Sequence, residues 1–334
     1  MKRALLLVTA VVLAGCSASA TPTPAPTVAP TVAPTVAPTT VAPTTAASPT
    51  LKIALSDITI AYSGYSTSNT YWNILGKSAA AEAAAKGVKF VDITATTNDS
   101  TIQLQAVNSE LTQKPSALII GSVDNKVFGT TITQAKAAGI PILAVDTGIS
   151  DPYISALIQT DNEGAGKLIG QQICTDTGGK GTVLDLGGTV GAQSGDARQL
   201  GVAEATAACG MTVDKQNGNW DSATDVNLAT STITSTPNLT AIFVPHSDGA
   251  AAVAKAVADK GKTSTIKTYG FDGSAAELTA ILNGTEAASI HQDNVGMGKT
   301  IVDDAITILE GGTVPQTVLI PPVLITKANA STFQ

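Results

Sequence analysis

The sequence has few of the residues that carry most catalytic chemistry. Its 334 residues include 2 histidines, 3 cysteines and 2 tryptophans, and aromatic residues make up 4% of the chain. The segment GAQSG (191–195) has Gln where the G-x-S-x-G nucleophile elbow requires Ser. No group of Cys, His, Asp or Glu has the spacing of a zinc site. We therefore expect a protein that is not an enzyme and needs no cofactor or metal.

The charges argue against nucleic acid as a partner. The net charge is −7 and Lys and Arg form no cluster, whereas nucleic acid binding needs a basic face. Two glycine-rich segments also fail as phosphate-binding loops. GMGKT (296–300) would need Gly where Asp293 stands, and GAGKLIG (164–170) is separated from the preceding strand by residues 161–163. We expect residues 296–300 to form the first turn of a helix.

The first 16 residues have the pattern of an export signal. Lys2 and Arg3 precede an apolar run (4–13) that is too short to span a bilayer. The run ends in LAGC, which resembles a bacterial lipobox and implies cleavage before Cys16 followed by lipidation of that residue. The alternative is a chance cysteine after a small apolar run. We predict a lipoprotein signal peptide over 1–16.

A tether and a folded part follow the signal. Residues 17–50 repeat Pro with Thr, Val and Ala and contain no charge, which predicts a disordered, Thr/Pro-rich tether. The chain from Leu51 onward is long enough for two domains. Beyond Cys16, Cys174 and Cys209 remain, an even number in an exported protein. We predict a disulfide between them, the alternative being two separate buried thiols.

From Leu51 the chain alternates short apolar segments with longer stretches of helix formers. The predicted strands of the first half are 51–55, 88–93, 116–121 and 140–146. The rhythm then starts again, with predicted strands at 153–159, 180–188, 210–216, 239–245, 265–271 and 286–292. Repeated βα units imply parallel sheets flanked by helices. We predict an α/β protein with two Rossmann-like lobes and a ligand cleft between them.

Several motifs carry a resemblance to a known family. AGIPILAVD, VLDLGG followed by DARQLGV, YGFDG and SIHQDNVGMG occur in this order along the chain. From residue 51 to about 328 the chain resembles the type I periplasmic sugar-binding proteins of ABC transporters, in the ribose-binding branch. The resemblance implies three hinge crossovers between the lobes. It also implies an N-terminal lobe of 51–160 plus 293–321 and a C-terminal lobe of 161–292 plus 322–334.

The resemblance also implies a set of ligand-binding residues. These are Asn69, Tyr71, Trp72, Asp146, Arg198, Trp220, His246, Ser247, Asp272 and Gln292. Carboxylates, amides and a guanidinium suit the hydroxyls of a sugar, and aromatic rings suit its C–H faces.

Alternatives remain for some of these residues. Asp272 is either a ligand contact or a helix cap, and Trp72 either a ligand contact or a core anchor. At PHSD (245–248), either His246 or Ser247 faces the cleft, and Asp248 caps the next helix. Thr147 follows Asp146 where ribose-type members have Arg, and the loop 56–68 is longer than in ribose binders.

These expectations lead to one function. We expect an extracytoplasmic lipoprotein, anchored at the outer face of the cytoplasmic membrane or elsewhere in the cell envelope, that captures a monosaccharide or similar polyol. Hinge closure would precede delivery to an ABC transporter permease with a separate ATPase, and the protein would act as a monomer. The alternatives are a sensor that presents its ligand to a membrane receptor and, less favoured, a small-carbohydrate enzyme.

Overall fold

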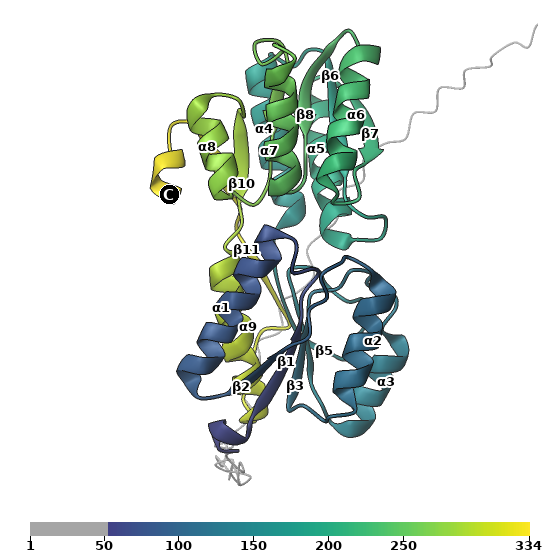
Figure 1. The fold of residues 1–334 in the computed structure, drawn as a ribbon, viewed down its shortest axis with the longest axis vertical. Helices are drawn as coiled ribbons and strands as arrows, with labels where there is room; N and C mark the ends of the chain where they lie inside the picture. Colours follow the sequence, from purple (N-terminus) through teal and green to yellow (C-terminus); the bar gives the residue numbers. More distant parts are fainter. Residues whose placement is uncertain (1–52) are drawn as a thin grey trace, which may run out of the picture. The chain divides into compact units, whose positions relative to one another are not determined.

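The computed structural model describes residues 53–334 (Figure 1). The predicted signal peptide, Cys16 and the predicted tether (17–50) lie outside the described residues. Within residues 53–334, no helix is both long enough and apolar enough to cross a membrane.

The first sheet has six strands in the order β11-β5-β4-β3-β1-β2, all parallel. Its strands are β1 (Thr59–Ser63), β2 (Lys89–Asp92), β3 (Ala117–Ile120), β4 (Ile142–Val145), β5 (Ile154–Thr160) and β11 (Thr317–Ile320). The helices of this lobe are α1 (Thr70–Lys86), α2 (Ser100–Leu111), α3 (Gly129–Ala138) and α9 (Asn294–Leu309). One core lies between the sheet and the pair α1 and α9, and a second lies between the sheet and the pair α2 and α3.

The second sheet has six strands in the order β12-β10-β9-β8-β6-β7. Its strands are β6 (Thr182–Gly187), β7 (Thr212–Asn217), β8 (Leu239–Phe243), β9 (Lys267–Tyr269), β10 (Ala288–His291) and β12 (Val323–Thr326). Only β12, at one edge, is antiparallel to its neighbour. The helices are α4 (Asn162–Thr177), α5 (Gln193–Ala208), α6 (Ser222–Ser235), α7 (Ser247–Asp259) and α8 (Ala275–Asn283). Short 3₁₀ turns lie at Leu55–Asp57 and Ala330–Phe333.

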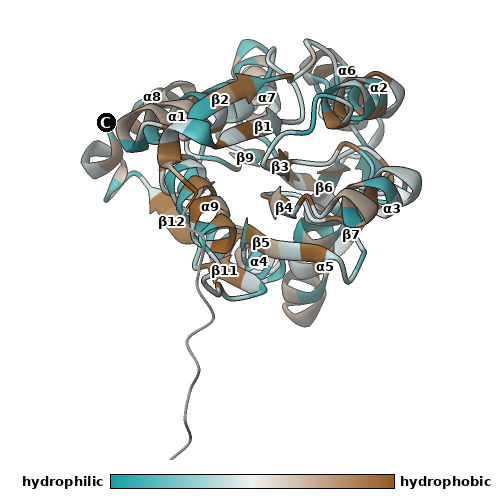
Figure 2. Cartoon of the chain, turned by 90° about the horizontal axis from the view of Figure 1, so that it is seen from below, coloured by the Kyte–Doolittle hydropathy of each residue, from teal (hydrophilic) through white to brown (hydrophobic). Residues whose placement is uncertain are grey.

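The predicted fold class is confirmed. Both lobes are α/β sandwiches in which helices that mix hydrophilic and hydrophobic residues surround the strands (Figure 2). The chain passes from one sheet to the other three times, between β5 and α4, between β10 and α9, and between β11 and β12. The residues of GMGKT lie in the first turns of α9, as predicted. Since all strands except β12 run parallel to their neighbours, their carboxyl ends collect at one edge of each lobe.

The first strand was predicted in the wrong place. Ile53 is 41% exposed and Leu55–Asp57 form a 3₁₀ turn, so the described part of the predicted strand, residues 53–55, does not form a strand. The strand is β1, within the segment 56–68 that was predicted to be a long loop. The physical reason is burial on both faces. Ile60 and Tyr62 face the core beneath α1 and α9, Ala61 faces the core beneath α2 and α3, and all three are buried.

The predicted disulfide is confirmed. Cys174, near the end of α4, is bonded to Cys209, which directly follows α5, and their Cα atoms are 6.2 Å apart. Helices α4 and α5 pack against one another along their lengths. The bridge joins their carboxyl-terminal ends, whereas their first turns lie toward the other lobe (Figure 1).

Candidate functional site

A cavity of about 30 Å³ lies at the carboxyl ends of strands from both lobes. It is lined by Tyr65, Asn69, Tyr71, Trp72, Asp146, Thr147, Ser194, Arg198, Trp220, His246, Asp272 and Gln292. Every residue of the predicted ligand set except Ser247 is among them. The cavity therefore brings together charged, amide and aromatic side chains from segments more than 200 positions apart in the sequence, such as Asn69 and Asp272.

Asp272 does not cap the helix that follows it. Ser274 is the N-cap of α8 and forms a capping box with Glu277. Instead, Asp272 Oδ2 accepts a hydrogen bond from the backbone N–H of Ser247 (3.0 Å), and Oδ1 accepts one from Gln292 Nε2 (2.7 Å). Ser247 is the first residue of α7, so the positive end of that helix stabilises the carboxylate. Asp272 is held rigidly at the cavity wall.

Asp146 occupies the corresponding position in the first lobe, directly after β4. Its backbone has φ +60°, in the left-handed region that is uncommon for residues other than glycine. Its Oδ1 accepts a hydrogen bond from the Tyr71 hydroxyl (2.7 Å), and its Oδ2 accepts one from the Thr147 hydroxyl (3.1 Å). Burial raises the pKa of the Asp146 carboxyl, and the charge of Arg198 opposes that rise.

Arg198, on α5, is almost completely buried beneath the cavity. It donates from Nε to Asn162 Oδ1 (2.8 Å), from Nη1 to the Pro245 carbonyl (2.6 Å) and from Nη2 to Gln292 Oε1 (3.2 Å). Its Cζ atom lies 3.7 Å from the centre of the Phe271 ring, a stacked geometry that suits the planar guanidinium.

The charge of Arg198 is balanced across the cleft. Burial lowers the pKa of this guanidinium, whereas the nearby carboxylates of Asp146 and Asp272 raise it. Arg198 is the one Arg or Lys side chain among the residues that line the cavity.

Two glycines position the tryptophans. A Cβ atom at Gly121, directly after β3, would lie 2.2 Å from the Trp72 ring, and one at Gly188, directly after β6, would lie 2.2 Å from the Trp220 ring. Each indole therefore lies against bare backbone at the end of a strand. Trp72 belongs to the core of the first lobe and also lines the cavity, so its place in the core does not prevent contact with a ligand.

His246, rather than Ser247, lines this cavity. Its Nδ1 accepts a hydrogen bond from the Gly249 N–H (3.3 Å), which makes it the N-cap of α7, and its Nε2 lies 2.7 Å from Asp225 Oδ2. The prediction that Asp248 caps this helix is wrong, because Asp248 lies one residue inside its first turn. Ser247 is buried behind the wall of the cavity and contributes its backbone N–H to the site.

Further side chains bridge the two lobes around the cavity. The bridging pairs are Tyr65 Oη with Thr189 Oγ1 (3.1 Å), Thr70 Oγ1 with Asp248 Oδ1 (3.0 Å), and Thr147 Oγ1 with Ser194 Oγ (3.3 Å). The sequence analysis did not assign Tyr65 or Ser194 to the site. Ser194 lies within the segment GAQSG (191–195) that was rejected as a nucleophile elbow, and only its place four residues before Arg198, one helical turn away, could have indicated that it faces the cleft.

Comparison with known proteins identifies the family to which this chain belongs. A family model described as "periplasmic binding protein domain" matches residues 60–313. The chain belongs to the periplasmic binding protein family. The match covers both sheets except for the edge strands β11 and β12 and part of β1.

Similar members of the periplasmic binding protein family include two curated proteins. The ribose import binding protein of Bacillus subtilis (strain 168) is 26% identical over 281 residues, which cover 84% of this chain and 91% of that protein. The D-allose-binding periplasmic protein of Escherichia coli (strain K12) is 26% identical over 278 residues, covering 78% and 89%. The crystal structure of a carbohydrate transporter solute-binding protein from Agrobacterium radiobacter in complex with D-arabinose has a TM-score of 0.77 and 25% identity, covering 82% and 96%.

Metal ligation finds no support in the described part of the chain. Across residues 53–334, no group of three or more His, Cys, Asp or Glu side chains could hold a metal ion. The cavity lining combines carboxylate, amide and guanidinium groups with aromatic rings, which can bind hydroxyl groups and C–H faces.

Proposed function

We propose that this periplasmic binding protein captures a monosaccharide or similar polyol between its lobes and delivers it to an ABC transporter permease that works with a separate ATPase. The observation that carries this proposal is the arrangement of Asp146, Arg198, Asp272 and Gln292 around one cavity with tryptophans on its walls. The relatives support it, since two of them are named as ribose- and D-allose-binding proteins and the similar crystal structure is a complex with D-arabinose.

The site chemistry suits vicinal hydroxyls. Each carboxylate oxygen of Asp146 and Asp272 already accepts one hydrogen bond and has a further lone pair for a ligand hydroxyl. Trp72 and Trp220 provide apolar faces for the C–H groups of a sugar ring.

Capture would occur by hinge bending at the three crossovers. The lobes we propose to move are 51–160 plus 293–321 and 161–292 plus 322–334. The side-chain pairs Thr70–Asp248 and Thr147–Ser194 join opposite lobes, so they would form on closure and break on opening. Gln292 lies at the second crossover and binds both Asp272 and Arg198, so hinge position and site geometry are coupled.

The place of action follows from the same proposal. The protein would act as a monomer outside the cytoplasm, tethered by residues 17–50 to a lipid on Cys16. It would perform no reaction on its ligand.

A thermal-shift screen of the full chain against pentoses, hexoses, polyols and nucleosides tests the proposal. A compound that binds only the folded state at 100 times its Kd adds about 2.7 kcal/mol to the free energy of unfolding. We expect compounds of one stereochemical class to raise the melting temperature. If no sugar or polyol does so, the proposed function is wrong.

A further inference from the structure

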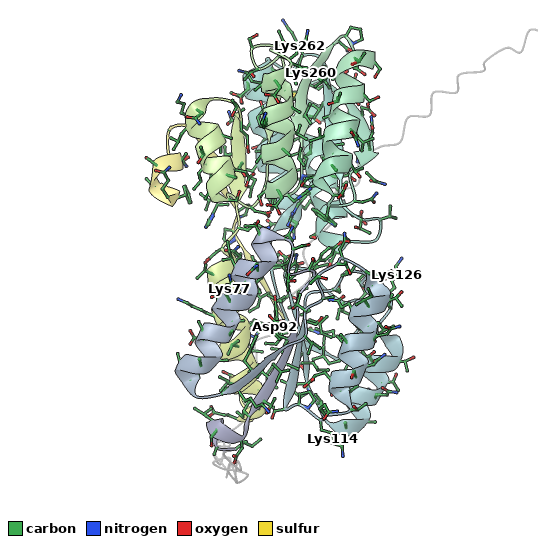
Figure 3. The ribbon with its side chains drawn as sticks, viewed as in Figure 1. Lys77, Asp92, Lys114, Lys126, Lys260 and Lys262 are labelled. Carbon is green, nitrogen blue, oxygen red and sulfur yellow. A yellow bond between two sulfur atoms is a disulfide. The ribbon has the colours of Figure 1, made fainter. Side chains whose placement is uncertain are left out.

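The cavity has an imbalance of charge. Its charged lining residues are two carboxylates, Asp146 and Asp272, and one guanidinium, Arg198. A third carboxylate, Asp225, lies directly behind His246 and is fully buried. Lys114, Lys260 and Lys262 lie at the ends of the lobes far from the cleft (Figure 3). No lysine lines the cavity, so nothing else within its walls offsets the second carboxylate.

His246 does not supply the missing charge. Its Nδ1 accepts a hydrogen bond from the backbone N–H of Gly249 and therefore carries no proton in this arrangement. Its Nε2 then carries the single proton and donates it to Asp225 (2.7 Å). The imidazole is neutral and both of its nitrogens are occupied.

Of the two carboxylates that line the cavity, Asp146 is the one that accepts no hydrogen bond from a cation or from a helix N-terminus. Asp272 is stabilised by the N-terminus of α7 through the Ser247 N–H. Both hydrogen-bond donors to Asp146, the hydroxyls of Tyr71 and Thr147, are neutral. The three donor nitrogens of Arg198 bind Asn162, Pro245 and Gln292, so none of these bonds reaches Asp146. A buried carboxylate in this position favours a cation.

The surrounding rings favour the same kind of ligand. Five aromatic side chains line the cavity, namely Tyr65, Tyr71, Trp72, Trp220 and His246. Tyr71 meets Trp72 edge to face, with ring centres 5.7 Å apart, and Tyr65 stacks on Trp72 at 6.0 Å. The negative faces of aromatic rings attract ammonium groups, most strongly where water is excluded. The carboxylate and the rings therefore surround one electronegative space.

We infer that the preferred ligand is a polyol bearing an ammonium group, an amino sugar or amino polyol, whose cation lies against Asp146. This inference rests on the proposed function, because it assigns the ligand class of the same cavity. The hydroxyls of the ligand would bind Asp272, Gln292 and Arg198, as in the neutral case. The amine would replace the cation that the walls of the cavity lack.

Isothermal titration calorimetry of the full chain with matched ligand pairs tests the inference. The pairs are D-glucosamine with D-glucose, D-galactosamine with D-galactose, and 2-amino-1,3-propanediol with glycerol, all near neutral pH. In at least one pair we expect the amine to bind about tenfold more tightly or better, because hydrogen bonds to charged groups are the stronger ones. The N-acetyl derivative of each amino sugar, which is neutral, should lose this advantage.

Two variants test whether the preference for the amine depends on Asp146. Asp146→Asn keeps the shape but removes the charge, so it should abolish the preference for the amine. Asp185→Asn is the matched control, since Asp185 is a fully buried carboxylate of the second lobe that does not line the cavity. It should leave the preference unchanged. The comparison of ligands on the unaltered protein remains decisive even if Asp146→Asn does not fold.

The results that would contradict the inference can be distinguished from those that would contradict the proposed function. If neutral sugars bind as tightly as their amines, or if Asp146→Asn folds and keeps the preference, the inference is wrong and the proposed function stands. If neither class binds and the thermal-shift screen also finds no sugar or polyol, both are wrong.

Discussion

Replacement of Arg198 by methionine should destabilise the protein even without a ligand. The guanidinium is almost completely buried and donates to Asn162, the Pro245 carbonyl and Gln292. Methionine replaces the aliphatic part of the arginine side chain but has no guanidinium to donate, so each of these acceptors loses a partner. The variant also leaves the Asp146 and Asp272 carboxylates without the cation that opposes their charge.

The expected magnitude follows from breaking a buried charge network. Removal of one partner from such a network costs about 3–5 kcal/mol. Arg198→Lys keeps the charge but lacks the planar fork, so we expect a smaller loss of about 1–3 kcal/mol. Urea-induced unfolding measures both as a lower midpoint at constant slope. The control is Lys255→Met, which breaks an exposed pair with Asp259 whose side chains are 74% and 63% exposed.

The Lys255→Met control also sets the result that would contradict this prediction. An exposed pair contributes at most about 1 kcal/mol. If Arg198→Met lowers the free energy of unfolding no more than Lys255→Met does, then the buried guanidinium does not compensate the two carboxylates and the account of the site electrostatics fails.

Three further predictions concern stability and the cavity walls. Burial raises the pKa of the Asp185 carboxyl from 3.8 to about 7, so its favourable contribution, present below about pH 4, is lost as the pH rises through 7. In Asp185→Asn, the free energy of unfolding should therefore change less with pH over this window. Urea titrations at several pH values measure this, and a pH dependence equal to that of the unaltered protein would contradict the prediction. Reduction of the Cys174–Cys209 disulfide, which closes a loop of sequence separation 35, should cost about 2–4 kcal/mol in urea unfolding. Ligand affinity should change little, because the bridge is remote from the cavity, and a large loss of affinity would refute that separation. Gly188→Ala places a methyl carbon 2.2 Å from the Trp220 ring, so it should shift indole emission and weaken ligand binding, and unchanged fluorescence and affinity would show that this wall is not rigid.

Most of the fold was predictable because its strands are short apolar runs between helix formers. The exception is the first strand. Residues 51–55 and β1 are both apolar, and only the parallel pairing of β1 with β2 and β3 determines which of them fills the sheet. That pairing joins Ile60 to Ala117, a long-range contact that local pattern does not encode.

The charged part of the candidate site was predictable because carboxylates at the ends of strands meet in one cleft. The family resemblance assigned Asp146 and Asp272 to the site, and both line the cavity. Two of the three hydrogen-bond partners of Arg198 were not predicted, because Asn162 and Pro245 come from segments that only the folded second lobe brings together. The cap of α7 was also missed. An aspartate at position 248 has the stronger capping tendency, but the bond between His246 and Asp225 holds the histidine one position before the helix.

The most direct test of the central claim is a crystal structure of the protein with the compound that gives the largest thermal shift. The account predicts one ligand between the two sheets, with polar atoms within hydrogen-bonding distance of Asp146, Arg198 and Asp272 and a face against Trp72 or Trp220. A ligand bound outside this cavity, with these side chains still bonded only to one another, would contradict the account.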